Sequence, residues 1–429
     1  MRPFFLGIFL WSFTVAEPII ETKYGKIRGF EYETKSGHIA EIYLGIPYAT
    51  PPIGDLRFEK PQPPSIWEDV KNCTKFGPTC LPHSKKAILS PAPSEDCLTL
   101  NVISPKEKNT TTGHPILVWI HGGGYEIGST SIYGYKDFAD IYIPNDIIVV
   151  TVQYRLGVYG FFSTGDSEIP GNYGLFDQTA ALKFINQNIV NFGVICDLRP
   201  RTMFILLFSY NLIDLEYHNL ISGSIEMSGS PWASWALGYN VPQHSKDLAQ
   251  IILQALECHN EIKKCMKERT VDEIFAAVQR IVSSPIKLRV IFIVEKFVSN
   301  LQGEATKDLN PIKFGPVIDE DFILKHPMEM VNEVAPKPAL IGLGNKESTF
   351  FTILALYPCI HSFGLTKEEF KSWNRQKLIE KLKVSFSERL KGSDYSMVKS
   401  AAFWTKMRKY GYDVPSLLKV AVSNEKEEL

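Results

Sequence analysis

The first indication of the fold comes from residues 115–129, which read PILVWIHGGGYEIGS. The opening run is apolar and rich in branched side chains, as is typical of a strand buried on both faces of a sheet. Three glycines follow His121, so backbone amides can converge on one point without side chains in the way. Converging N–H groups stabilise the anionic oxygen formed in acyl transfer, and the pattern predicts an oxyanion loop. A tight turn that binds nothing is the alternative.

Further apolar runs follow the same pattern. They are IIVVTVQY (147–154), MFILLF (203–208), SIEMSGS (224–230) and PALIGLG (338–344). Between them, residues 175–192 place Leu182, Ile185 and Ile189 on one face of a predicted helix. Strands that alternate with helices predict an α/β fold, with a mostly parallel sheet covered on both faces and chemistry at the carboxyl ends of the strands.

Composition excludes several classes of partner. The 429 residues have a formal net charge of −1, with no stripe of lysine or arginine, so we expect neither nucleic acid nor an acidic membrane surface as a partner. Beyond the N-terminal residues, no apolar stretch reaches the roughly 18 residues that a membrane span needs. No linker or repeat divides the sequence, and we expect a single domain over residues 17–429. The oligomeric state stays open.

Residues 1–16 read as a signal peptide, with Arg2 before a short apolar run and small residues ahead of Glu17. A buried N-terminal strand is the alternative. Asn72 and Asn109 begin N-x-T triplets and are expected glycosylation sites. The last four residues, KEEL, are similar to a lumenal retention signal, although a frayed charged tail is the alternative. We therefore expect the endoplasmic reticulum lumen, or secretion.

Several motifs, in order along the chain, resemble the type-B carboxylesterases, the cholinesterase-like α/β hydrolases. Their sequence pattern is most similar to that of invertebrate gut esterases. They are YLGIPYATPPIGDLRF (43–58), SEDCLTLNV (94–102), PILVWIHGGGYEIGS (115–129), VTVQYRLGVYGFFS (150–163), GNYGLFDQTAALKFI (171–185) and IEMSGSPWASWA (225–236). The likeness covers residues 18–193 and, more loosely, 218–370. It implies an α/β-hydrolase fold and a small-molecule ester substrate, with no cofactor or metal.

The resemblance also implies a mechanism. In such enzymes a serine attacks the ester carbonyl, a histidine relays protons and a glutamate orients the histidine. Gly123 and Gly124 match the oxyanion donors, and Glu347 matches the triad acid, with a solvated surface carboxylate as the alternative. Trp232 and Trp235 are candidates for lining an acyl pocket, with core packing equally favoured.

Similarity further suggests structural links. The implied disulfides are Cys80 with Cys97 and Cys258 with Cys265, leaving Cys73, Cys196 and Cys359. The implied ion pairs, which take no part in catalysis, are Arg57 with Glu95 and Arg155 with Asp177.

The nucleophile is where the resemblance fails. A nucleophile elbow needs small residues two positions before and after its serine, yet no G-x-S-x-G occurs in the 429 residues. Family spacing places the elbow near Ile205, in a segment (194–219) that reads as replaced. Ser209 comes four residues later, flanked by Leu207 and Asn211, and we do not expect it to attack.

The base is missing as well. The last histidine is His361, which lies too close to Glu347 for the family's spacing and reads as an ordinary loop residue. The chain reads as abbreviated after about residue 390, which would leave the sheet incomplete at that edge. We therefore expect a catalytically inactive chain whose ancestral activity is carboxylic ester hydrolysis. The alternatives are a non-catalytic binding protein and a mis-spliced or frameshifted version of an active esterase.

Overall fold

The computed structural model describes residues 17–82, 91–108, 113–193, 203–207, 220–227, 241–283, 314–325 and 339–342. Apart from residues 282 and 283, all of them belong to one compact unit.

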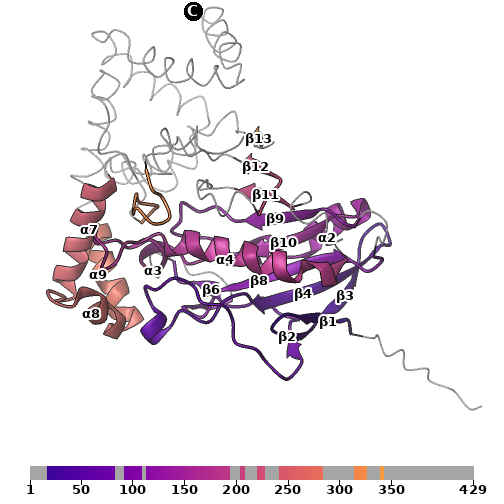
Figure 1. Cartoon of the computed structure of the whole chain (residues 1–429), viewed down its shortest axis with the longest axis horizontal. Helices are drawn as coiled ribbons and strands as arrows, with labels where there is room; N and C mark the ends of the chain where they lie inside the picture. Colours follow the sequence, from indigo (N-terminus) through magenta and orange to yellow (C-terminus); the bar gives the residue numbers. More distant parts are fainter. Residues whose placement is uncertain are drawn as a thin grey trace, which may run out of the picture. The chain divides into compact units, whose positions relative to one another are not determined.

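An eight-stranded sheet forms the centre of this described part, in the order β13-β12-β11-β9-β10-β8-β4-β3 (Figure 1). Its strands are β3 (Phe30–Glu33), β4 (Ile39–Pro47), β8 (Thr99–Pro105), β9 (Ile116–Ile120), β10 (Ile148–Val152), β11 (Met203–Leu207), β12 (Gly223–Met227) and β13 (Ala339–Gly342). The five strands from β13 to β10 run parallel, and β8, β4 and β3 continue the sheet in antiparallel fashion. The predicted mostly parallel sheet is therefore confirmed.

Both faces of the sheet are covered, and every residue of β9 and β10 except Thr151 is apolar. Their even-numbered residues, such as Val118 and Val150, join a core cluster with helix α4 (Tyr173–Asn188). Their odd-numbered residues, such as Trp119, join a second cluster with helix α2 (Lys136–Tyr142). Continuous burial of β9 and β10 explains why their sequences show no polar alternation.

The helix expected over residues 175–192 divides into α4 and a 3-10 turn, η4 (Ile189–Phe192). Leu182, Ile185 and Ile189 are all buried, as their spacing predicted. Gly193 ends this turn in the left-handed region, with φ +102°.

Short elements surround the main sheet. A small sheet holds β1 (Ile19–Thr22), β2 (Gly25–Arg28) and β5 (Lys71–Asn72), and β6 (Thr79–Cys80) pairs with β7 (Pro93–Ser94). The short helices are α1 (Thr130–Tyr133), α3 (Gly157–Phe161), η1 (Gly54–Leu56) and η3 (Ile143–Asn145). Residues 48–70, rich in proline, contain only η1 as regular structure.

A helical segment contributes to the same core as α4. It comprises α7 (Val241–Ala255), α8 (Ile262–Glu268) and α9 (Val271–Ser283). Arg57 fastens α8, because its Nη1 donates to the carbonyl oxygens of Met266, Lys267 and Arg269 at the carboxyl end of that helix. No helix within the described ranges is long and apolar enough to cross a membrane.

Candidate active site

Three neighbouring parallel strands end at the same level of the sheet. Ile120, the last residue of β9, pairs with Val152 at the end of β10 and with Leu207 at the end of β11. Loops at the carboxyl ends of parallel strands are where α/β folds place their chemistry. The glycine loop, residues 121–129, leaves the sheet at this level, and so does the chain that follows β11.

The backbone of the glycine loop requires glycine at two positions in particular. Gly123 has φ +133°, and a Cβ added there would lie 2.1 Å from the carbonyl oxygen of Ile127. Gly128 has φ +122°, and its Cβ would lie 2.4 Å from Nδ1 of His121. Side chains at these positions would therefore force the loop to open.

The loop turns back on itself through one carbonyl group. Gly123 accepts hydrogen bonds from the amides of Glu126 and Ile127, both at 3.2 Å. Within the described part of the chain, the backbone amides of Gly123 and Gly124 donate no hydrogen bond. Gly123 is exposed and Gly124 half-buried. Their role as oxyanion donors stays a prediction that this geometry permits.

His121 belongs to the frame of the loop. Its ring is fully buried and stacks on Tyr154, with 4.7 Å between the ring centroids. The hydroxyl of Tyr154 donates to the carbonyl oxygen of His121 at 2.9 Å. Burial lowers the pKa of His121 to about 4, so the imidazole is neutral near pH 7. A neutral ring without exposure to solvent fixes the start of the loop and is poorly placed to exchange protons with a substrate.

Strand pairing shows where a nucleophile would be expected, directly after β11. Because β11 ends at Leu207, the strand continues two residues beyond Ile205, where family spacing had placed the elbow. Ser209 is therefore the second residue after the strand in a sequence that reads L-F-S-Y-N. Ser209 itself lies outside the described residues.

Glu226 is a carboxylic acid placed among apolar strands. It lies on β12, opposite Leu207, and its side chain is 5% exposed. Ser224 Oγ donates to Glu226 Oε1 at 3.0 Å, and no described residue supplies a cation to the carboxyl group. Burial raises the pKa of Glu226 to about 7, although the serine hydrogen bond opposes the shift. The only sequence signal for Glu226 is a charged side chain inside an otherwise uncharged strand, too weak to predict a site.

Comparison with known proteins identifies the family. The carboxylesterase family profile matches residues 16–194 and 208–415. The chain belongs to the carboxylesterase family. The two matched ranges leave out residues 195–207, which include β11 and fall within the segment expected to diverge.

Two curated relatives are gut esterases of nematodes. The chain is 42% identical over 380 residues to gut esterase 1 of Caenorhabditis briggsae, covering 86% of this chain and 61% of the relative. It is also 42% identical over 378 residues to gut esterase 1 of Caenorhabditis elegans, with the same coverage. The chain thus spans about three fifths of the length of the curated relatives it matches.

A solved structure confirms the α/β-hydrolase architecture. The carboxylesterase EST55 of Geobacillus stearothermophilus matches with a TM-score of 0.62 and 28% identity, covering 85% of this chain and 67% of that chain. The mixed α/β sheet described above is therefore the sheet of a carboxylesterase.

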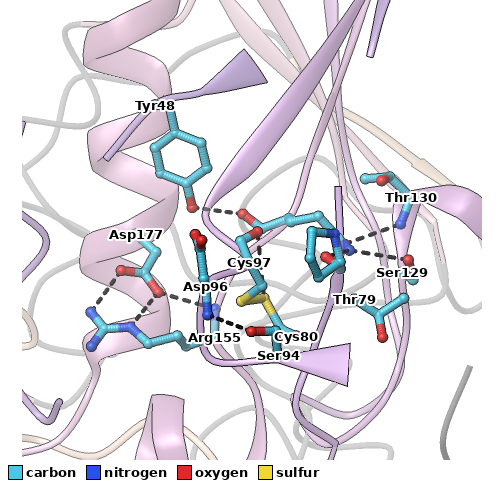
Figure 2. The surroundings of a disulfide bond; sticks show 12 residues. Tyr48, Thr79, Cys80, Ser94, Asp96, Cys97, Ser129, Thr130, Arg155 and Asp177 are labelled. Atoms are coloured by element: carbon cyan, nitrogen blue, oxygen red, sulfur yellow. Dashed lines mark hydrogen bonds and ion pairs between the residues drawn. A yellow bond between two sulfur atoms is a disulfide. The ribbon is translucent and has the colours of Figure 1, made fainter. Parts of the chain in front are cut away.

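The disulfides implied by the family are present. Cys80 and Cys97 are bonded, as are Cys258 and Cys265 (Figure 2 shows the first pair). Cys73 is a buried free thiol, and burial raises its pKa to about 12. Such a thiol stays protonated and unreactive near neutral pH.

Both implied ion pairs are also present. Arg57 meets Glu95 with Nε–Oε2 and Nη2–Oε1 distances of 2.6 and 2.5 Å. Arg155 meets Asp177 at 2.8 and 2.7 Å in the same two-pronged manner (Figure 2). These pairs are structural, since each also holds backbone groups: Arg57 fastens α8, and Asp177 accepts from the amide of Arg155 at 3.0 Å.

Other predicted residues lie outside the described residues. They are Glu347, His361, Trp232, Trp235, Asn109, Cys196 and Cys359. Their roles stay predictions. Asn72 is described and exposed at the end of β5, so its side chain is accessible to a glycan. The described ranges contain no cluster of side chains suited to hold a metal ion.

Proposed function

We propose that this carboxylesterase-family chain keeps the glycine loop of an ester hydrolase but lacks a competent serine nucleophile. Its ancestral activity is hydrolysis of small carboxylic esters. In this chain, turnover would be at best very slow.

One observation carries the proposal. β11 occupies the strand position beside β9, yet the chain beyond Leu207 reads F-S-Y-N where a glycine-flanked serine belongs. The strand-to-helix bend of an elbow crowds the residues two positions before and after the serine, so leucine and asparagine there would collide with the backbone. Losing the nucleophile of a triad enzyme costs on the order of a millionfold in turnover.

A second candidate is a weak esterase that uses Ser209. The end of β11 at Leu207 favours it, because Ser209 follows the strand by two residues rather than lying well beyond it. Its flanking side chains argue against this candidate.

Ester turnover separates the two candidates. The full chain and a Ser209→Ala variant would be assayed with a short p-nitrophenyl ester beside gut esterase 1 of Caenorhabditis elegans. The proposal expects equal rates for the chain and the variant, both about a millionfold below an active enzyme. A faster wild-type rate that Ser209→Ala abolishes would establish the second candidate.

We also propose that the chain resides in the endoplasmic reticulum lumen or is secreted. Two disulfides are compatible with an oxidising compartment, and exposed Asn72 is compatible with a glycan. Expression in animal cells with endoglycosidase H digestion tests both points. Cell-associated protein whose glycans endoglycosidase H removes would indicate retention. Protein in the medium whose glycans resist the enzyme would indicate secretion. Unglycosylated protein in the cytosol would contradict the proposal, with Asn72→Gln as the control for that site.

A further inference from the structure

Gln153 is the first residue after β10, and its side chain reaches the end of the glycine loop. Its Nε2 donates to Ser129 Oγ at 3.1 Å, and its Oε1 accepts from the amide of Thr130 at 3.1 Å. Gln153 is 1% exposed, so these hydrogen bonds do not compete with solvent. The carboxamide thereby fixes the residues where the loop passes into α1.

The residues that follow Gln153 hold the rest of the loop. Tyr154 binds its start, through the hydroxyl bond to the carbonyl oxygen of His121 and the ring stacking. Gly157 binds its middle, because its amide donates to the carbonyl oxygen of Tyr125 at 2.7 Å. The segment 153–157 thus contacts the loop at its beginning, middle and end, and Gln153 is the member that binds the end.

Gln153 is itself held on its other side by the chain around a disulfide. Its amide donates to the carbonyl oxygen of Thr99 at 3.0 Å, and its Nε2 also lies 3.4 Å from the carbonyl oxygen of Pro78. Thr99 comes two residues after Cys97, and Pro78 two residues before Cys80. Figure 2 draws Ser129 and Thr130 together with this disulfide. Tyr48 adds a third bond, from its hydroxyl to the carbonyl oxygen of Gln153 at 2.6 Å.

A neighbouring carboxamide supports the same end of the loop. Asn101 Nδ2 donates to Thr130 Oγ1 at 3.1 Å and to Thr151 Oγ1 at 2.9 Å. Asn101 binds the Thr130 side chain, whereas Gln153 binds its backbone. Of these two carboxamides, Gln153 is therefore the one that fixes the main chain at Thr130.

We propose that Gln153 is the positioning residue of the glycine loop, fixing its Ser129–Thr130 end to the chain around the Cys80–Cys97 disulfide. In this role Gln153 acts through the loop: it holds the backbone that carries the amides of Gly123 and Gly124. It would hold the loop in this way whether or not those amides ever meet an ester.

The test compares hydrogen exchange in the full-length protein and its variants. Gln153→Met keeps the volume and removes the side-chain hydrogen bonds. The matched control is Asn188→Leu, since Asn188 is equally buried in α4 and bonds to the amide of Lys23 at 2.6 Å and the carbonyl oxygen of Phe184 at 2.8 Å. Ser129→Ala is a milder variant for the case in which Gln153→Met does not fold; it removes the bond to Gln153 together with the hydroxyl's bonds to the amide and Oγ of Ser131. Ser131→Ala, which removes the Ser131 Oγ contact, is its control. Cys80→Ala/Cys97→Ala tests the link to the disulfide.

We expect Gln153→Met to speed exchange of the peptide covering residues 121–130 by at least about tenfold, because a lost buried hydrogen bond favours local opening. Asn188→Leu should leave the exchange of that peptide unchanged, even if it lowers global stability as much as Gln153→Met does. The amide resonances of ¹⁵N-labelled Gly123 and Gly124 should move in Gln153→Met and not in the control. The Ser129→Ala and double-cysteine variants should speed loop exchange by smaller factors.

Two outcomes would overturn the proposal. One is loop exchange and glycine resonances in Gln153→Met and Ser129→Ala that match the wild type. The other is an increase that Asn188→Leu reproduces, which would mean that the loop reports only global stability. Unchanged loop exchange in the double-cysteine variant alone would overturn the part assigned to the disulfide.

Discussion

Leu207 of β11 lies opposite Ile120 of β9 in parallel register. Two segments therefore leave the sheet at one level: the glycine loop, which keeps its three glycines, and the chain after β11, which carries no G-x-S-x-G. Because the register fixes this level independently of family spacing, the missing glycine-flanked serine is a local change in sequence at a preserved position in the sheet. The sheet of a carboxylesterase is thus present in a chain that carries no G-x-S-x-G.

The buried pair Arg155–Asp177 should contribute strongly to stability. In the ion pair, the side chains of Arg155 and Asp177 are 4% and 0% exposed, so Asp177→Asn leaves a buried guanidinium without its counter-charge. We expect a loss of about 3–5 kcal/mol in the free energy of unfolding, measured by urea denaturation. Glu261→Gln, which breaks the exposed pair with Lys264, should cost less than about 1 kcal/mol. Similar losses in the two variants would refute a structural role for the buried pair.

Glu226 should make the protein less stable as pH rises. The folded protein holds the proton up to about pH 7, whereas a free glutamate with a pKa of 4.5 releases it earlier. Folding therefore binds a proton between these values, and stability falls across that window by up to about 3 kcal/mol. Glu226→Gln removes this contribution. Between pH 5 and pH 7.5, the free energy of unfolding should fall more for the wild type than for the variant. A difference between the two proteins that is independent of pH would disprove the shifted pKa.

Gly123 should be far less replaceable than a glycine with open space around it. Gly123→Ala places a methyl group against the Ile127 carbonyl, in addition to the cost of a positive φ. Gly37→Ala is the matched control, since Gly37 has φ +84° and no atom within 4 Å of the added Cβ. The control should cost about 1–2 kcal/mol, and Gly123→Ala clearly more, by thermal or urea denaturation. Equal costs would show that the loop relaxes and that its tight geometry is not required.

The sequence was most informative where hydrophobic pattern and position in the chain agree. Continuous apolar runs located β9, β10 and β11, and three-and-four spacing located the buried face of α4. Family motifs supplied the disulfides and ion pairs, which local pattern could not, because Arg57 and Glu95 are far apart in the chain and meet only after folding.

Other features depend on tertiary contacts that no local pattern encodes. Gln153 looks like an ordinary polar residue at the end of a strand, and only strand register brings it to Ser129 and Thr130. Family spacing placed the elbow near Ile205, whereas β11 continues to pair with β9 as far as Leu207. The one hint available for Gln153 was a polar side chain directly after a fully apolar strand.

The most direct measurement is the intact mass of the full chain after incubation with a fluorophosphonate probe, beside gut esterase 1 of Caenorhabditis elegans. These probes phosphonylate a serine only where it is presented and activated as a nucleophile. We predict no adduct on this chain under conditions that label the active esterase completely. A stoichiometric phosphonyl adduct on any serine, with Ser209 the first to check by peptide mapping, would contradict the account.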